Sequence, residues 1–549
     1  MTYDLRREPW IPWRTRSGRF EWSSPSALTN GVADDPVVAL AAPRPDFDGA
    51  LQEFLIGLLT AALLPANEEE WLTHWMTPPS PSELLKAFDA LPPAFNLDGD
   101  GPRFFQDFST QDFADIKPTP IEQILLNAPG DQTVRLNTDL FVKRGRVSRM
   151  GRPAAAMALL TMQTYAPSGG QGHRTSLRGG GPLTTLVDPR LDNYTLWHML
   201  WANVETRIQW NARRPDNATD DVFPWLHPTR VSDPATGGAT SPSDGHPLQV
   251  YFGLPRRIRL EFGDTGECDL TGRPDDRTVV AFRMRNYGVQ YDGWQHPLSP
   301  YRASARTPNL WLPVHGQPGG INWRDWLGLT FRVPATHRRP AATVEWFQSQ
   351  RARALSGGAG RVHAFGYDMD NMKARAWVES AFPVFTTPGA EHQGRLVENI
   401  QYLVNGTELA ASALLTNIKR ALFQRADVPG DLSQAKTDLW IATEGDFLET
   451  VRQIASSSAA IDSDYLIRER FIRTLARKAA EIFDRWCSME SLPIDTVRRL
   501  VTARFYLVAT LNGHSKLGEK MFTMLGMPLD DRQRAPRPRK QGKEPEAAA

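Results

Sequence analysis

The part of the chain beyond about residue 392 constrains the fold most, because it consists of long segments with the apolar spacing of helices. In the third segment an apolar face runs through Ile467, Phe471, Leu475, Ile482 and Trp486. Four such helices with short connections predict a four-helix bundle. The segments are 395–423, 445–457, 464–489 and 495–513. The basic residues of the third, which we expect largely off the apolar face, are Arg468, Arg470, Arg473, Arg477 and Lys478.

The longer N-terminal part has a more irregular pattern. We expect a helix from about Asp48 to Leu64 and a shorter one over 82–91. Between about 248 and 331, short β-like runs are separated by Gly, Pro and Asp, as in antiparallel sheets. These runs are LQVYFGL (248–254), RIRLEF (257–262), TVVAFRM (278–284) and NLWLPV (309–314).

The length of 549 residues is too great for one ordinary core. We therefore predict an α+β protein with more than one domain. A large, irregular mixed N-terminal domain is expected over 1–390 and a C-terminal four-helix bundle over 391–528. The polar, Pro- and charge-rich residues 529–549 are expected to be a disordered tail.

Composition limits the class of protein. Lys plus Arg number 63 and Asp plus Glu 62, so a polyanionic partner has to be argued from local clusters. Two cysteines, Cys268 and Cys487, exclude a disulfide framework and form no zinc knuckle by themselves. The first residues lack the apolar stretch of a signal peptide, and the apolar run 54–64 is too short to span a bilayer. We expect a soluble cytoplasmic protein with no membrane partner.

Motifs of catalysis are missing from the sequence. It contains no H-E-x-x-H, no G-x-S-x-G and no cysteine placed with a histidine as a nucleophile. Asp368 and Asp370 are a minimal hard-cation pair, although two carboxylates on a turn more often cap the backbone. We expect a binding protein without a catalytic site, cofactor or metal. A metal-dependent nuclease using Asp368 and Asp370 stays open as the alternative.

Three places combine positive charge with features suited to nucleic acids. The segment 135–152 carries Phe141, Lys143, Arg144 and Arg146, and cations beside an aromatic ring suit strand binding. The second is the glycine loop APSGGQGHRTSLRGGGP (166–182), whose residues at issue are Ser168, Gly169, Gly170, Gln171, Gly172, His173, Arg174 and Arg178. A backbone with so few side chains can enter a narrow groove. The loop fits neither of the two glycine patterns that bind nucleotides, G-x-x-x-x-G-K-[ST] and G-x-G-x-x-G.

The third place is the β-like run ending in Arg285, together with the turn expected over 366–377. The tip of that turn holds Asn371, Met372 and Lys373, which are a polar amide, an apolar wedge and a cation. Proteins that open a duplex from the minor groove use such side chains. An ordinary polar loop is the simpler interpretation of these residues taken alone.

The chain resembles the large subunit (CasA) of the type I-E CRISPR surveillance complex, Cascade. The resemblance rests on the opening EPWIPWRTRSGRFEWSSPSAL, the SLRGGGPLTTLV run, WQHPLSPY (294–301) and GYDMDN, in this order and at these separations. It implies an irregular α+β domain followed by a four-helix bundle. It also implies a non-catalytic subunit that recognises the protospacer-adjacent motif of double-stranded DNA from the minor groove and starts strand separation.

The resemblance assigns roles to residues of this chain. It places the glycine loop at Ser168–Gly172, a basic hairpin residue at Arg285, and the wedge at Asp370, Asn371 and Met372. Lys373 is then a candidate phosphate contact beside the wedge. The loop with Phe141, Lys143, Arg144 and Arg146 is a candidate contact for guide RNA or DNA. Candidate contacts of the bundle with the displaced strand are Arg468, Arg473 and Arg477.

The resemblance also implies partners and exposes departures. The partners are target DNA, the 5′ end of the guide RNA, the backbone, handle-binding and small subunits of Cascade, and the helicase–nuclease. Some relatives hold zinc with paired CxxC motifs, whereas the corresponding segments here read GRPAAAM and GECDLTG, so we predict no zinc. Gln171 stands where glycine is common, and Asn371 is shorter than the usual glutamine. A purely structural scaffold for guide RNA and protein is a further alternative.

Overall fold

The structure is a computed structural model in which two compact units are distinguished. One unit comprises residues 1–321 and 328–386, and the other comprises 322–327 together with the chain from 387 onward. The mixed helix-and-sheet fold class is confirmed. The residues described are 2–139, 144–189, 193–211, 221–235, 237–307, 309–333, 337–352, 360–370, 372–385, 389–423, 431–457, 461–488 and 494–527.

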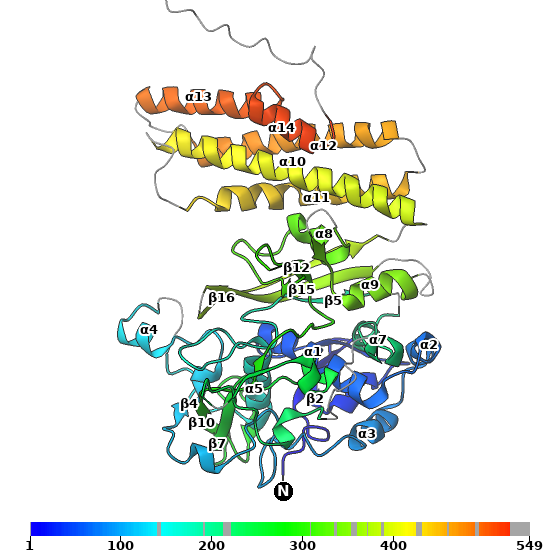
Figure 1. The fold of residues 1–549 in the computed structure, drawn as a ribbon, viewed down its shortest axis with the longest axis vertical. Helices are drawn as coiled ribbons and strands as arrows, with labels where there is room; N and C mark the ends of the chain where they lie inside the picture. The colour runs from blue at the N-terminus through cyan, green and yellow to red at the C-terminus, as the bar shows by residue number, and fades with distance from the viewer. Residues whose placement is uncertain are drawn as a thin grey trace, which may run out of the picture. The chain divides into compact units, whose positions relative to one another are not determined.

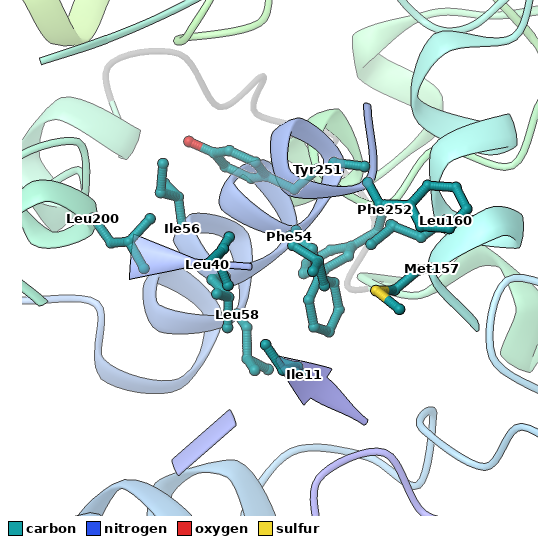
Figure 2. Packing of buried hydrophobic residues seen from close by; sticks show 14 of the residues in the cluster. Ile11, Leu40, Phe54, Ile56, Leu58, Met157, Leu160, Leu200, Tyr251 and Phe252 are labelled. Carbon is teal, nitrogen blue, oxygen red and sulfur yellow. The ribbon is translucent and has the colours of Figure 1, made fainter. Parts of the chain in front are cut away.

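Helix α1 (Pro45–Leu63) is the centre of the first unit's core. Its sequence is apolar on nearly every side, as expected of a helix buried all round. Figure 2 shows Phe54 of α1 close to Ile11, Met157 and Phe252, which come from distant parts of the chain. Burying one such side chain contributes about 1.5–3 kcal/mol. The helix expected over 48–64 is thus confirmed, as is the shorter one, α3 (Pro81–Asp89).

Short antiparallel sheets surround this core. The runs 257–262 and 278–284 are confirmed as strands β7 (Arg257–Phe262) and β10 (Val279–Arg285), which pair with each other. The strand expected over 309–314 is reduced to β13 (Trp311–Pro313). The prediction for 248–254 is wrong: Pro247–Val250 is a buried 3-10 helix, capped by the His246 ring, which accepts from the Leu248 N–H. A short apolar run does not distinguish the two structures.

The last part of the first unit along the chain is a long β-hairpin. Strands β15 (Gly360–Asp370) and β16 (Lys373–Val384) pair in antiparallel register, and β5 (Thr184–Asp188) adds to the free edge of β15. The expectation of a turn over 366–377 is therefore corrected, because most of these residues are paired strand and the chain reverses only at the tip. Figure 1 shows β15 and β16 as long strands, which pair along most of their length.

The second unit is a helical bundle. Its four long helices confirm the predicted bundle, and a short helix, α14, follows them. The segment 322–327 is added to it, since the Trp323 ring stacks on Phe447 at 4.2 Å and its indole N–H donates to the Trp440 carbonyl at 2.8 Å. The helices are α10 (Ala390–Leu422), α11 (Gln434–Ser456), α12 (Ile461–Trp486), α13 (Ile494–Leu511) and α14 (Lys516–Met524). The predicted tail, 529–549, lies outside the described residues.

No single helix in the described part of the chain is long and apolar enough to cross a bilayer. Helices α1 and α2 (Glu68–Met76) reach the length and apolar composition of a span only when taken together, and they are bent by 116° relative to each other.

Candidate nucleic-acid interface

The glycine loop is closed at its base. It leaves the buried helix α5 (Arg152–Tyr165) and returns where the Ser176 N–H donates to the Ala166 carbonyl at 3.1 Å. The Arg256 guanidinium, only 4% exposed, donates to the Pro167 carbonyl. Burial lowers the pKa of Arg256 to about 10. These bonds fix the base, so that Ser168, Gly170 and Gln171 form an exposed tip.

The far side of the tip is joined to the end of β10. The Tyr287 N–H donates to the Gly172 carbonyl at 2.7 Å, and the Gln171 amide donates to the Tyr287 hydroxyl at 3.2 Å. Gly172 has a φ of +78°, and a Cβ there would lie 2.7 Å from the Cβ of Asn286. Only glycine fits this position without strain. Arg285 precedes Tyr287 by two positions, so the glycine loop is bonded to the chain just beyond the end of the strand that carries the hairpin arginine.

The later glycines pack against the β15–β16 hairpin. Gly181, with a φ of +63°, leaves no room for a Cβ, which would lie 2.4 Å from Cγ of Met369. A Cβ on Gly180 would lie 3.2 Å from the Ser168 nitrogen. The chain then enters β5, where Thr184 pairs with Phe365 of β15. The glycine loop, the end of β10 and the hairpin therefore share one packed scaffold within the first unit.

The positive charge of the loop is lower than its sequence suggests. Arg178 is buried, and its guanidinium donates to Glu53 of α1 at 2.6 Å. Arg174 is half-buried and donates to the hydroxyl and carbonyl of Ser232. Burial lowers the pKa of His173, which favours its neutral form. The expectation that Arg178 adds charge to the loop surface is corrected, because its charge is neutralised inside the core.

Arg285 is half-buried at the C-terminal end of β10, the middle strand of its sheet. Its guanidinium donates to the Asp112 carbonyl and forms an ion pair with Asp115 at 2.6 Å. The Asp115 side chain is 72% exposed, and an exposed pair of this kind contributes only about 0–1 kcal/mol. The guanidinium is thus held in place by a partner that a phosphate or a base edge can replace at small cost.

The hairpin tip presents side chains to solvent. Asp370 pairs in register with Lys373, and the Met372 side chain is 58% exposed. Asn371 lies outside the described residues. Arg375 donates to Asp368 at 2.7 Å and lies 3.6 Å from Asp370. In the described part of the chain, no group of three or more His, Cys, Asp or Glu is placed to hold a metal ion.

The basic segment around residue 144 is described only in part. Phe141 and Lys143 lie outside the described residues. Arg144 forms a two-point ion pair with Asp139 and lowers the pKa of that carboxyl by hydrogen bonding to it. Arg146 is exposed. These two arginines line a cavity of about 550 Å³. Arg44, the residue directly before α1, lines the same cavity.

The bundle corrects one of the predicted displaced-strand contacts. Arg473 and Arg477 are exposed on α12 and pair with Glu469 and Glu481 one turn away. Arg468 is instead buried, where its guanidinium donates to Asn399 and lies 5.2 Å from the Tyr402 ring. A side chain 6% exposed is not placed to bind a DNA strand.

The segments that correspond to the relatives' CxxC motifs do meet in space. A Cβ on Gly151 would lie 3.4 Å from the Cβ of Cys268, which is buried. Arg152 of the first segment also forms an ion pair at 2.6 Å with Asp275, which lies three positions beyond the second segment. The absence of zinc stays a prediction.

Sequence reasoning missed two residues that organise the interface. Tyr287 joins the glycine loop to β10, and Glu53 anchors Arg178 from the centre of α1. A local signal was available for Tyr287, because Asn286-Tyr287-Gly288 follows the strand and has the composition of a turn. In the structure Tyr287 has a φ of +64°, as a residue in such a turn can have. Glu53 lies 125 positions from Arg178 and gives no such signal.

Comparisons with known proteins cover nearly the whole chain. The sequence matches the family of the CRISPR-associated protein Cse1 over residues 4–482. The fold is similar to that of Thermobifida fusca Cse1, with a TM-score of 0.69 at 17% identity, over 96% of this chain and 99% of that one. Thermus thermophilus CasA (Cse1) gives 0.64 at 19% identity, over 92% and 98%.

A chain from a structure of a CRISPR RNA-guided surveillance complex is also similar. Its TM-score is 0.66 at 17% identity, over 92% of this chain and 99% of that one. At these identities the likeness to the solved structures concerns the fold.

Proposed function

The chain belongs to the Cse1 family of CRISPR-associated proteins, and from this we propose that it is a non-catalytic subunit of an RNA-guided surveillance complex that reads the motif adjacent to a DNA target. The observation that carries the proposal is the joining of the glycine loop, the end of β10 and the hairpin on one scaffold. A protein that contacts both edges of a short DNA motif needs a fixed spacing between the residues that make these contacts.

The glycine loop is suited to the minor groove of the duplex. That groove is about 6 Å wide, and a backbone without side chains enters it where others are excluded. A Cβ on Gly170 would meet no atom within 4 Å, so the space beside this residue is open. Readout in the minor groove mainly separates A·T from G·C pairs, which suits a reader of several related motifs.

The hairpin tip supplies the wedge. Met372 is an exposed apolar side chain, and its neighbours in the sequence, Asp370, Asn371 and Lys373, are polar or charged. Inserting such a wedge between base steps costs a few kcal/mol of stacking, which contacts of Lys373 and Arg285 with phosphates offset. Pairing with the guide then reads the sequence beyond the motif.

The remaining partners follow from the same family membership. We place the 5′ end of the guide RNA at the segment with Phe141, Lys143, Arg144 and Arg146. The exposed Arg473 and Arg477 of the bundle are placed along the displaced strand. The other subunits of the complex and a helicase–nuclease are the expected protein partners.

The test is binding of a matched target duplex to the reconstituted complex at one fixed salt concentration. Duplexes with the correct and a scrambled adjacent motif are compared for the native chain, for Asn371→Ala/Met372→Ala, and for the complex without this subunit. We expect discrimination to vanish without the subunit and to weaken in the double variant. Unchanged discrimination in both cases would leave this chain a scaffold.

The nuclease alternative has its own outcome. Arg375 forms ion pairs with both Asp368 and Asp370, and a positive charge beside the two carboxylates disfavours a hard cation there. Magnesium-dependent cleavage of DNA by the purified chain, lost in Asp370→Ala, would establish a nuclease instead.

A further inference from the structure

The pairing of β15 with β16 (Figure 1) is interrupted by a β-bulge just before the hairpin tip. Up to Asp368, which pairs with Ala376, each residue of β15 faces one residue of β16. Met369 then pairs with Ala374, so Arg375 has no opposite residue on β15. A bulge of this kind bends its strand and increases the local twist, and near functional sites it redirects side chains. The direction of the tip beyond the bulge therefore depends on Arg375.

The Arg375 side chain ties the bulge to the neighbouring strand. Its guanidinium donates to the Asp368 carboxylate at 2.7 Å and lies 3.6 Å from the carboxylate of Asp370. The Asp368 side chain is only 9% exposed, so water and salt screen this ion pair less than they screen a fully exposed one. The one residue that has no partner in the backbone register is thus held across the hairpin by its charge.

The support of β15 from its other edge reaches Asp368. On that edge β5 pairs with β15 as far as Phe365, and Gly316 forms a bridge with Asp368. A Cβ on Gly316 would lie 2.5 Å from the Tyr367 carbonyl oxygen, so the two segments are in close contact. In the described part of the chain, residues 369 and 370 form backbone pairs with β16 alone. The bulge and its ion pair therefore lie where the supported part of the strand ends.

We propose that Arg375 is a positioning residue for strand opening: as the bulge residue paired with Asp368, it sets the direction in which Met372 points from the hairpin. Asp370 pairs with Lys373, which leaves only residues 371 and 372 to connect the strands. A connection this short follows the direction and twist of the strands that it joins. The role of Arg375 rests on the proposed function of Met372 as the wedge. A direct contact of the Arg375 guanidinium with a DNA phosphate is the alternative.

The experiment measures binding and opening separately in the reconstituted complex. Its matched duplex carries the correct motif and 2-aminopurine at the first target base pair, so that anisotropy follows binding and fluorescence follows opening. Asp368→Asn removes the anionic partner but keeps the Arg375 charge, whereas Arg375→Gln removes the charge. Each variant is expected to retain binding and to slow opening on the order of tenfold, a coupling typical of residues in one ion-pair network. Because both changes break the same pair, the double variant should open no more slowly than either single variant.

A direct phosphate contact would give a different pattern. Arg375→Gln would then make the slope of log affinity against log salt shallower by about 0.9, the change for one phosphate contact on duplex DNA. Asp368→Asn would free the guanidinium and strengthen binding. A shallower slope together with tighter binding by Asp368→Asn would overturn the positioning role.

Two further variants separate this role from charge and from folding. Arg361→Gln removes an exposed arginine at the far end of β15 and is expected to change neither binding nor opening. Deletion of Arg375 removes the bulge and leaves every other pair of the hairpin in register. It is expected to keep the native melting temperature, because a continuous hairpin replaces the bulged one, and to slow opening at least as much as Arg375→Gln.

Met372→Ala provides the reference for the outcome. Slower opening in this variant, with native opening in Asp368→Asn and in the deletion of Arg375, would overturn the positioning role and leave the wedge in place. Native opening in all three would overturn the wedge, and the role of Arg375 with it.

Discussion

The glycine loop and the hairpin tip belong to the same scaffold but differ in what they allow. Gly172 and Gly181 have positive φ values and no space for a Cβ, so the loop is specified by its backbone. Met372 and Lys373 point into solvent, and the hairpin below them is held by strand pairing. A change at Gly172 or Gly181 therefore acts through folding, whereas a change at the exposed hairpin tip acts on the ligand alone.

The largest loss of stability is expected on substitution of Glu53, which is bonded to Arg178 of the glycine loop and to Thr184 of β5, the strand beside the hairpin. Glu53 accepts hydrogen bonds from Arg178, Tyr165 and Thr184 within 2.7 Å. Glu53→Gln leaves the buried Arg178 charge uncompensated and is expected to lower the free energy of unfolding by about 3–5 kcal/mol. Chemical denaturation measures this loss. The double variant Glu53→Leu/Arg178→Met should recover much of it, and a double variant as unstable as the single one would refute the ion-pair explanation.

A smaller loss of stability is expected on substitution of Gly172, and none is expected on substitution of Gly170 in the same loop. Gly172→Ala places a Cβ at a positive φ against Asn286 and is expected to cost about 2 kcal/mol, whereas Gly170→Ala meets open space. Thermal unfolding of both variants provides the measurement. Gly170→Ala should keep its melting temperature yet weaken binding to the motif. Equal melting temperatures for the two variants would contradict the backbone account.

A pH dependence is expected where α1 lies near the hairpin. Burial raises the pKa of Asp48 to about 7, with the neighbouring charge of Glu379 adding to the effect. The folded state then keeps a proton that the unfolded state releases, so stability falls as the pH rises from about 4 to 7. Asp48→Asn removes this loss, and its stability advantage over the native chain should grow by about 1–2 kcal/mol between pH 5 and pH 8. A constant difference over this range would show that Asp48 titrates normally.

The smallest effect on stability is expected at the tip. Met372→Ala removes an exposed side chain and should change the free energy of unfolding by less than about 0.5 kcal/mol. Denaturant titration of the variant against the native chain checks this. A loss as large as that of Gly172→Ala would erase the difference between the two regions.

The helical parts of the fold were predictable from the sequence, and much of the interface was not. Helix α1 and the long bundle helices follow from apolar spacing over many residues. The prediction that Arg468 lies on the surface of the bundle was wrong, although the helical spacing indicated a buried position. Arg468 precedes Phe471 by three positions and Leu475 by seven, so it lies on the same face of the helix as these apolar residues. The run 248–254 was too short to separate strand from helix.

Long-range contacts account for the remaining failures. Arg178 is buried because Glu53, far away in sequence, provides its partner, and no local pattern indicates such a pair. The meeting of Gly172 with Tyr287 likewise depends on how β10 ends. The glycines themselves indicated close approach, but the sequence did not say whether the approaching group was a ligand or the protein's own chain.

The central claim is that the tip opens the duplex while the loop holds it. Fluorescence of 2-aminopurine at the first target base pair beside the motif measures opening in the reconstituted complex, and anisotropy of the same duplex measures binding. For Met372→Ala we predict retained binding to the correct motif with reduced opening. Opening at the native rate and amplitude in this variant and in Asn371→Ala/Met372→Ala would contradict the account.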